Sequence, residues 1–208
     1  MPETADGIGT AFDQAAAEGR AALVPYVTSG HPAPEYTARV LEMLAEEGAD
    51  VIELGVPFSD PLADGPTIQR SSYEAIGHGV DLAWTLEALA GFRASHRVPV
   101  VLFSYLNPIL CYGIDRFLRD AVAAGAQGVL LTDLPVGADP EVEGRIDASA
   151  LDRIRLVAPT THPERVAQIA RGAQGFLYYV SRTGVTGASA ELRADLAHEV
   201  AGIRRRCT

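Results

Sequence analysis

Short apolar segments alternate with segments of helical periodicity along most of the chain. Six apolar runs, rich in β-branched residues, have the length and composition of buried strands. They cover Ala21–Thr28, Asp50–Leu54, Val98–Ser104, Gln127–Thr132, Ile154–Ala158 and Gly175–Val180. Helical spacing of apolar residues occurs between them, in Glu35–Glu47, Leu82–Arg93, Ile114–Ala124, Glu164–Arg171 and Glu191–Arg206. Gly137–Ala150 is polar and poorly periodic, so only a short or weak helix is expected there.

Near-continuous apolar strands that alternate with helices are typical of a parallel sheet covered on both faces. Such a sheet is either a closed barrel or an open, doubly wound sheet. The open dinucleotide-binding form needs a G-x-G-x-x-G turn after its first strand, whereas this chain has TSGHPAP there. Unusual polar residues gather where the predicted strands end, as they do in barrel enzymes. The sequence therefore predicts an α/β fold of the TIM (β/α)8 barrel type, forming one domain over residues 1–208.

Composition narrows the classes of partner. With 27 acidic and 17 basic residues the formal net charge is −10, which disfavours binding to nucleic acid or to an anionic membrane. No apolar run reaches the ~20 residues of a membrane span, and no leader pattern begins the chain, so a cytoplasmic location is expected. Cys111, Cys207 and the five histidines show no metal-ligand spacing, so no metal site is expected.

Two carboxylates stand out as candidate acid–base groups. Glu53 lies inside the apolar run VIELG, where an ionised group is costly to bury. It is either a structural carboxylate bonded to a neighbouring hydroxyl or arginine, or a general acid–base group with a raised pKa. Asp64 follows in the proline-rich loop PFSDPLADGPTIQ, where Asp60 and Asp64 also suit turns or helix caps.

The end of the sixth predicted strand, YYVSRTGVTGAS, is a candidate anion-binding loop. Gly184 and Gly187 free the backbone to approach an anion, while Arg182, Thr183 and Thr186 offer donors. A plain flexible connection is the alternative.

Six blocks in the order and spacing found here resemble the tryptophan synthase alpha subunit family. They are PYVTSGHP, GADVIELGVPFSDPLADGPTIQ, NPILCYG, LLTDLP, LVAPTT and YYVSRTGVTG. The resemblance implies retro-aldol cleavage of indole-3-glycerol phosphate to indole and glyceraldehyde 3-phosphate, in tryptophan biosynthesis. It implies that Glu53 is the general acid–base group and that Asp64 binds the indole N–H. It also implies substrate contacts from Tyr26, Phe103, Tyr105, Leu130, Tyr178, Arg182, Thr186 and Gly187.

The same resemblance implies a partner and limits the cofactors. The partner is the beta subunit, which carries pyridoxal phosphate, in an alpha2beta2 assembly; the alpha chain itself needs no metal or organic cofactor. The contacts implied with that partner are Pro57, Asp60, Asn107 and Pro135. Two other functions stay open: a non-catalytic homologue that only docks on the beta subunit, and a free-standing lyase that releases indole.

The chain departs from the family pattern at three places, one of which is the weakly periodic segment Gly137–Ala150. His31 in TSGHP stands where the family usually has Asp. The chain ends at RRRCT, before the family's last two strand–helix units, so about six of eight units are expected. Unpaired first and last strands would then favour association or a loosened fold. Because such barrels bind phosphate with their last loops, weak turnover is expected.

Overall fold

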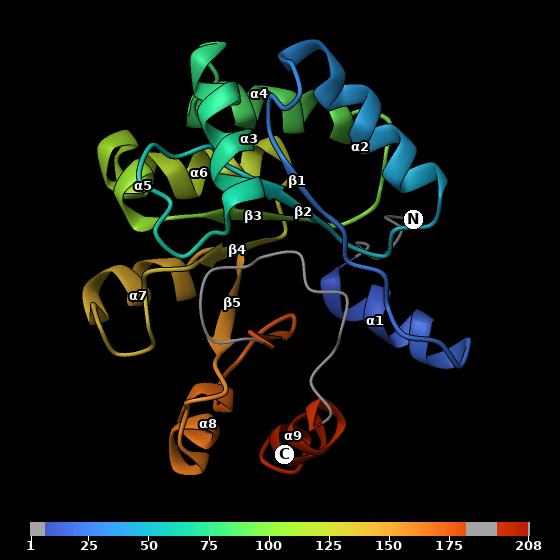
Figure 1. Ribbon diagram of the computed structural model, residues 1–208, viewed down its shortest axis with the longest axis vertical. Helices are drawn as coiled ribbons and strands as arrows, with labels where there is room; N and C mark the ends of the chain where they lie inside the picture. Colours follow the sequence, from blue (N-terminus) through green and yellow to red (C-terminus); the bar gives the residue numbers. More distant parts are fainter. Residues whose placement is uncertain (1–6, 182–194, 208) are drawn as a thin grey trace.

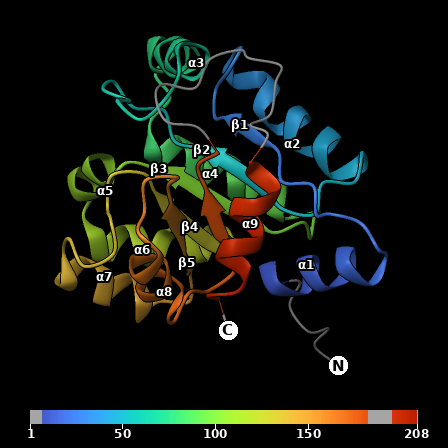
Figure 2. The same ribbon diagram turned by 60° about the horizontal axis from the view of Figure 1, so that its bottom comes forward.

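The computed structural model describes residues 7–181 and 195–207. Its centre is a six-stranded parallel sheet in which the spatial order of the strands equals their order in the chain. The strands are β1 (Tyr26–Thr28), β2 (Ile52–Gly55), β3 (Val100–Ser104), β4 (Gly128–Leu131), β5 (Asp152–Val157) and β6 (Leu177–Tyr179). The sheet curves like part of a barrel wall, with helices packed along its outer face (Figures 1 and 2). All six predicted strands are thus confirmed, although β1 begins five residues later than predicted, at Tyr26.

Helices follow most strands. They are α1 (Ile8–Ala17), the 3₁₀ turn η1 (Pro34–Tyr36), α2 (Thr37–Glu46), α3 (Pro66–Gly77), α4 (Leu82–Arg93), α5 (Leu106–Tyr112), α6 (Ile114–Ala124), α7 (Pro140–Asp147), α8 (Pro163–Ala170) and α9 (Leu196–Arg204). The weak segment does form a short helix, α7, because Asp139 caps it by accepting from the N–H groups of Glu141 and Val142. Within the described ranges, no helix is long and apolar enough to cross a membrane.

Three helices were not predicted from the sequence: α1, α3 and α5. The sequence places the start of α3 in the proline-rich loop, whereas Pro66 is the first residue of this helix. Proline suits that position because a backbone N–H there would have no partner within the helix. α5 is only seven residues long and contains Pro108, so its periodicity is short.

The two faces of the sheet have different surroundings. Alternate strand residues such as Ile52, Leu54 and Leu102 form the main core with the outer helices. The other residues face the concave side, where Val101 and Leu130 pack with Ile8 of α1. The parallel register places Glu53 between Tyr26 and Val101, and residues paired in this way point to the same face. Glu53 therefore belongs to the concave face, near the carboxyl end of β2.

Candidate active site

Glu53 is a buried carboxyl group. It is 4% exposed, and its Oε1 atom has no hydrogen-bond partner among the described residues. Removal from water penalises the charged form, which raises the pKa of Glu53 to about 7. A carboxyl group with this pKa exchanges its proton near neutral pH, as a general acid–base group must. The structural alternative, a carboxylate held by a neighbouring hydroxyl or arginine, has no such partner at Oε1 within the described part of the chain.

Tyr26 lies against β2 because Gly55 has no side chain. A Cβ atom at Gly55 would stand 2.1 Å from the Tyr26 hydroxyl and 2.6 Å from Cζ. Behind the ring, the Thr28 hydroxyl lies 3.3 Å from the Tyr26 hydroxyl and 2.7 Å from that of Ser71 on α3. The sequence analysis missed both Gly55 and Ser71. A glycine inside an apolar strand is a signal of close approach that could have identified Gly55.

Three aromatic rings line the concave face in a row. The rings of Tyr26 and Phe103 meet edge to face with centroids 5.2 Å apart, and those of Phe103 and Tyr178 are 6.2 Å apart. All three side chains are half-buried, while Leu130 beneath them is fully buried. Burial raises the pKa of both tyrosines, and the charges of Glu53 and Asp64 raise it further, which places both carboxylates close to this row. Within the described residues, the row presents apolar ring surface that suits a flat aromatic ligand.

Asp64 is held over the ends of the strands by Tyr105, which follows β3. The Tyr105 hydroxyl donates to Asp64 Oδ2 at 3.1 Å and accepts from the Ala63 N–H at 2.9 Å. Partial burial raises the pKa of Asp64, and the hydrogen bond from Tyr105 opposes that shift. Burial and the Asp64 charge raise the pKa of Tyr105 to about 12, so its hydroxyl stays protonated. Asp64 also closes a turn, since its backbone N–H donates to the carbonyl oxygen of Pro61 at 3.0 Å, while its side chain bonds to a different strand–loop unit.

The loop after β4 is tied to the same rim. Asp133 Oδ1 accepts from the N–H of Leu106 at 2.8 Å, at the start of α5. His31, the departure in the first loop, lies with its Nδ1 atom 3.1 Å from Oε2 of Glu74 on α3. Its side chain therefore joins the loop after β1 to the helix that follows the Asp64 loop.

Three predicted substrate contacts, Arg182, Thr186 and Gly187, lie outside the described residues. Among residues 7–181 and 195–207, no group of three His, Cys, Asp or Glu side chains is placed to hold a metal ion.

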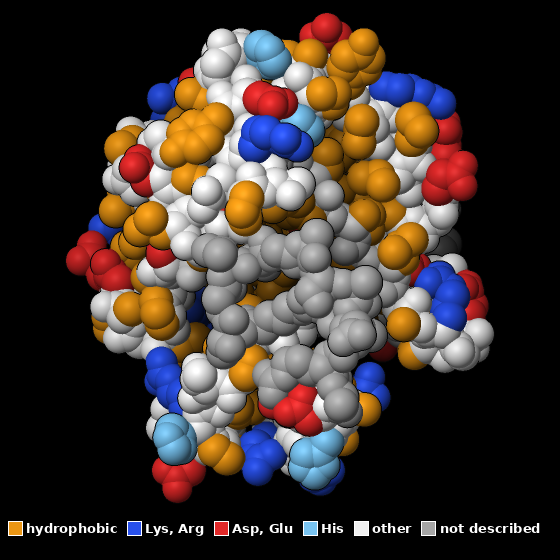
Figure 3. All heavy atoms as spheres, viewed as in Figure 1, with side chains coloured by type: hydrophobic (Ala, Val, Ile, Leu, Met, Phe, Trp, Pro, Cys, Tyr) orange, Lys and Arg blue, Asp and Glu red, His pale blue; other side chains and the backbone are white. Residues whose placement is uncertain are grey.

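Three of the four predicted partner contacts are exposed: Asp60, Asn107 and Pro135. Pro57 is buried, so it does not offer a surface in the single chain. Apolar side chains accompany the exposed group, since Leu62 is 86% and Leu110 50% exposed. Hydrophobic side chains also gather over α2 (Figure 3). Asp60, Asn107 and Pro135, together with Leu62 and Leu110, form a surface of polar and apolar side chains around the loops that carry Asp64 and Tyr105.

Comparisons with known proteins agree with this geometry. The family model described as tryptophan synthase alpha chain matches residues 12–208. The tryptophan synthase alpha chain of Chromobacterium violaceum is 49% identical over 188 residues, which cover 90% of this chain and 72% of that protein. That of Geobacter sulfurreducens is 46% identical over 201 residues, covering 97% and 76%.

Solved structures give the same result. A Mycobacterium tuberculosis tryptophan synthase structure superposes with a TM-score of 0.88 at 38% identity, covering 99% of this chain and 78% of that one. A tryptophan synthase alpha chain from Legionella pneumophila gives a TM-score of 0.84 at 37% identity, covering 96% and 74%. The chain thus spans about three quarters of the length of these relatives. It belongs to the tryptophan synthase alpha chain family.

Proposed function

We propose that this chain is the lyase of tryptophan biosynthesis that cleaves indole-3-glycerol phosphate to indole and glyceraldehyde 3-phosphate. The observation that carries the proposal is the buried Glu53 carboxyl group, which lies beside a row of aromatic rings. Its pKa is about 7. The reaction needs one group that gives and takes a proton near neutral pH next to a flat apolar ring. Family membership supplies the identity of that ring.

Glu53 would act first as an acid and then as a base. Its proton goes to indole C3, which forms the indolenine tautomer with a positive charge near the ring nitrogen. The resulting carboxylate takes the proton of the glycerol C3′ hydroxyl, the C3–C3′ bond breaks, and its electrons return to the indole ring. Indole and the aldehyde leave, and Glu53 carries a proton again, so the step balances without a metal or an organic cofactor.

The remaining residues would bind and orient the substrate. Asp64 accepts a hydrogen bond from the indole N–H and stabilises the positive charge that develops there. Tyr26, Phe103, Leu130 and Tyr178 pack around the ring. Arg182, Thr186 and Gly187 belong to the loop that would close over the substrate.

The partner would be a tryptophan synthase beta subunit, which holds the pyridoxal phosphate, in an alpha2beta2 assembly. Asp60, Asn107 and Pro135, with the exposed Leu62 and Leu110, form the surface that would receive it. A cytoplasmic location goes with this role and rests on the family alone.

Release of indole from indole-3-glycerol phosphate tests the proposal, with the full chain assayed alone and with a tryptophan synthase beta subunit. We expect turnover that the beta subunit increases, and a loss of about 10²–10⁴-fold in Glu53→Gln. Glu87→Gln, an exposed carboxylate on α4, is the matched control and should keep full activity.

Two outcomes would favour the other functions. Binding to the beta subunit without any turnover would indicate a docking homologue. Turnover that is equally fast with and without the beta subunit would indicate a free-standing lyase. Near-normal activity in Glu53→Gln would remove Glu53 from the mechanism.

A further inference from the structure

A cavity of about 420 Å³ lies beside the outer face of β5, between α8 and the segment 134–136. The polar side chains that line it include the cations Arg153, Arg155 and Arg165, the imidazole of His162 and the hydroxyls of Thr160 and Thr161. Among the described residues, none of the lining side chains is acidic. This is unusual in a chain of net charge −10, and it makes the potential in the cavity positive.

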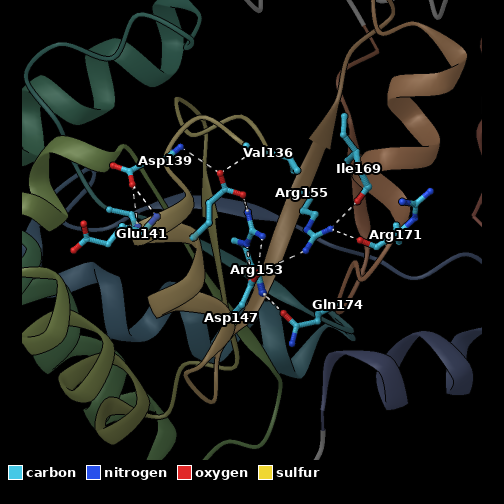
Figure 4. Close-up of polar contacts among 12 residues, drawn as sticks. Val136, Asp139, Glu141, Asp147, Arg153, Arg155, Ile169, Arg171 and Gln174 are labelled. Atoms are coloured by element: carbon cyan, nitrogen blue, oxygen red, sulfur yellow. Dashed lines mark hydrogen bonds and ion pairs between the residues drawn. The ribbon is translucent and has the colours of Figure 1, made fainter.

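Arg153 is fully paired by α7. Its Nη1 atom donates to Glu143 at 2.6 Å, while Nε and Nη2 donate to the two carboxylate oxygens of Asp147 at 2.7 and 2.8 Å (Figure 4). These bonds satisfy the guanidinium and neutralise its charge. Arg153 is thus a structural wall of the cavity.

Arg155 differs, because one edge of its guanidinium has no hydrogen bond. Nη1 donates to the carbonyl oxygens of Ile169 and Arg171 at 2.9 and 2.7 Å, so Arg155 is fixed to the end of α8 (Figure 4). Nη2 lies 3.9 Å from Asp147, too far for a hydrogen bond. Nε is buried and has no partner among the described residues, although the side chain is only 8% exposed.

The free edge has the geometry of an oxyanion receptor. Nε and Nη2 present two parallel N–H donors, the arrangement that binds a carboxylate or phosphate with two hydrogen bonds. Burial is the largest cause that lowers the pKa of Arg155, and the Arg153 charge adds to it, while the charges of Asp147 and Glu143, both hydrogen-bonded to Arg153, oppose the shift. A buried donor left without an acceptor is unfavourable, and an anion would supply that acceptor.

The opening of the cavity adds further positive character. Arg165 donates to the carbonyl oxygen of Val136 and to Oε1 of Gln168, both neutral acceptors, and it forms no ion pair with the described residues. His162 caps α8, and Pro163 begins it. The N-terminal end of a helix carries unpaired N–H groups and a partial positive charge.

We propose that this cavity is a binding site for a small oxyanion, the phosphate or carboxylate group of a metabolite, held by the free edge of Arg155 with Arg165 and His162 at the opening. The site lies on the outer side of the sheet and is separate from the concave face that carries Glu53.

The Nε–Hε resonance of Arg155 in the full chain, followed by ¹⁵N–¹H NMR, tests the proposal. Inorganic phosphate is titrated in one arm and malonate in the other, with sodium chloride holding the ionic strength constant. We expect the Arg155 signal to shift and saturate in at least one arm, which also tells whether phosphate or carboxylate is preferred. Arg20 is the internal control, since its Nε atom is bonded to Glu18 and its signal should stay in place.

Two variants locate the site. Arg155→Lys keeps the charge but removes the two-donor edge, so it should assign the signal and abolish saturable binding. Arg165→Gln removes a cation at the opening and should weaken binding roughly tenfold, equivalent to about 1.4 kcal/mol. If Arg155→Lys does not fold, the titration of the Arg155 signal in the native chain and the binding measured for Arg165→Gln still test the proposal. An Arg155 signal that does not move in either arm would overturn the proposal, as would binding unchanged in Arg165→Gln, and neither result depends on lyase activity.

Discussion

The hydroxyl of Tyr105 donates a hydrogen bond to the carboxylate of Asp64 across two neighbouring strand–loop units. The same hydroxyl accepts from the N–H of Ala63, so Tyr105 fixes both the backbone and the side chain of the Asp64 loop. Resemblance to the family predicted a substrate contact at Tyr105. The structure adds a second role, because the position and ionisation of Asp64 depend on this side chain.

Tyr105→Phe should lower turnover roughly tenfold and move the acid limb of the pH–rate profile to higher pH. The hydrogen bond from Tyr105 lowers the pKa of Asp64, so without it the carboxylate is protonated at a higher pH. Steady-state kinetics between pH 5 and 9 would measure the shift. Tyr112→Phe is the matched control, because Tyr112 makes a similar hydrogen bond to the carboxylate of Asp120 on α6. Equal profiles for the two variants would contradict the assigned role.

Glu53→Gln should stabilise the fold at neutral pH even as it removes activity. The folded-state pKa of Glu53, about 7, lies above its ordinary value of 4.5. As pH rises, Glu53 therefore ionises first in the unfolded chain. The native protein loses unfolding free energy between pH 4.5 and about pH 7, and it loses none below pH 4.5. The gain in the variant should approach about 3 kcal/mol above pH 7 and vanish below pH 4.5. Urea unfolding of both proteins across this range gives the difference, with Glu87→Gln as the unchanged reference.

Gly55→Ala should displace Tyr26, since the added Cβ atom would meet its ring. We expect a loss of about 1–3 kcal/mol in unfolding free energy and a higher KM for indole-3-glycerol phosphate. Thermal unfolding and kinetics measure the two effects. Gly91→Ala in α4 is the control, because the space around Gly91 is open and alanine favours the helix. A Gly55→Ala protein with native stability and KM would show that Tyr26 is not held by this contact.

Glu143→Gln should cost about 1–3 kcal/mol in unfolding free energy, because Arg153 would lose one of its two counter-ions and keep its two hydrogen bonds to Asp147. Glu141→Gln on the same helix breaks only the exposed pair with Arg145 and should change the unfolding free energy much less. Urea unfolding of the two variants measures the contrast. Similar costs would mean that the buried pair does not hold α7 to the sheet.

The sequence predicted the parts of the fold whose pattern is regular. Strand number, order and fold class follow from the apolar runs, while α3 and α5 were missed because prolines stand at or near their starts. β5 was predicted to begin at Ile154, whereas the strand begins two residues earlier, at Asp152, and includes Arg153. The acids of α7 that satisfy Arg153 are six and ten residues earlier in the chain. A single domain over residues 1–208 stays a prediction.

Predictability of the site differed from residue to residue. Glu53 was identified from the residues alone, because a carboxylate inside an apolar strand is anomalous. The aromatic row needed the family resemblance, since Phe103 and Tyr178 read equally well as barrel core. The unbonded edge of Arg155 depends on contacts that only the folded chain reveals.

The bond between Asp133 and the N–H of Leu106 has a mechanical consequence. Pro135, on the proposed partner surface, is two residues from Asp133, and Leu106 adjoins Tyr105, which holds Asp64. One hydrogen bond thus joins the loop after β4 to the start of α5, and a second joins Tyr105 to the loop that carries Asp64. We expect a displacement of Pro135 to be transmitted to Asp64 through these two hydrogen bonds.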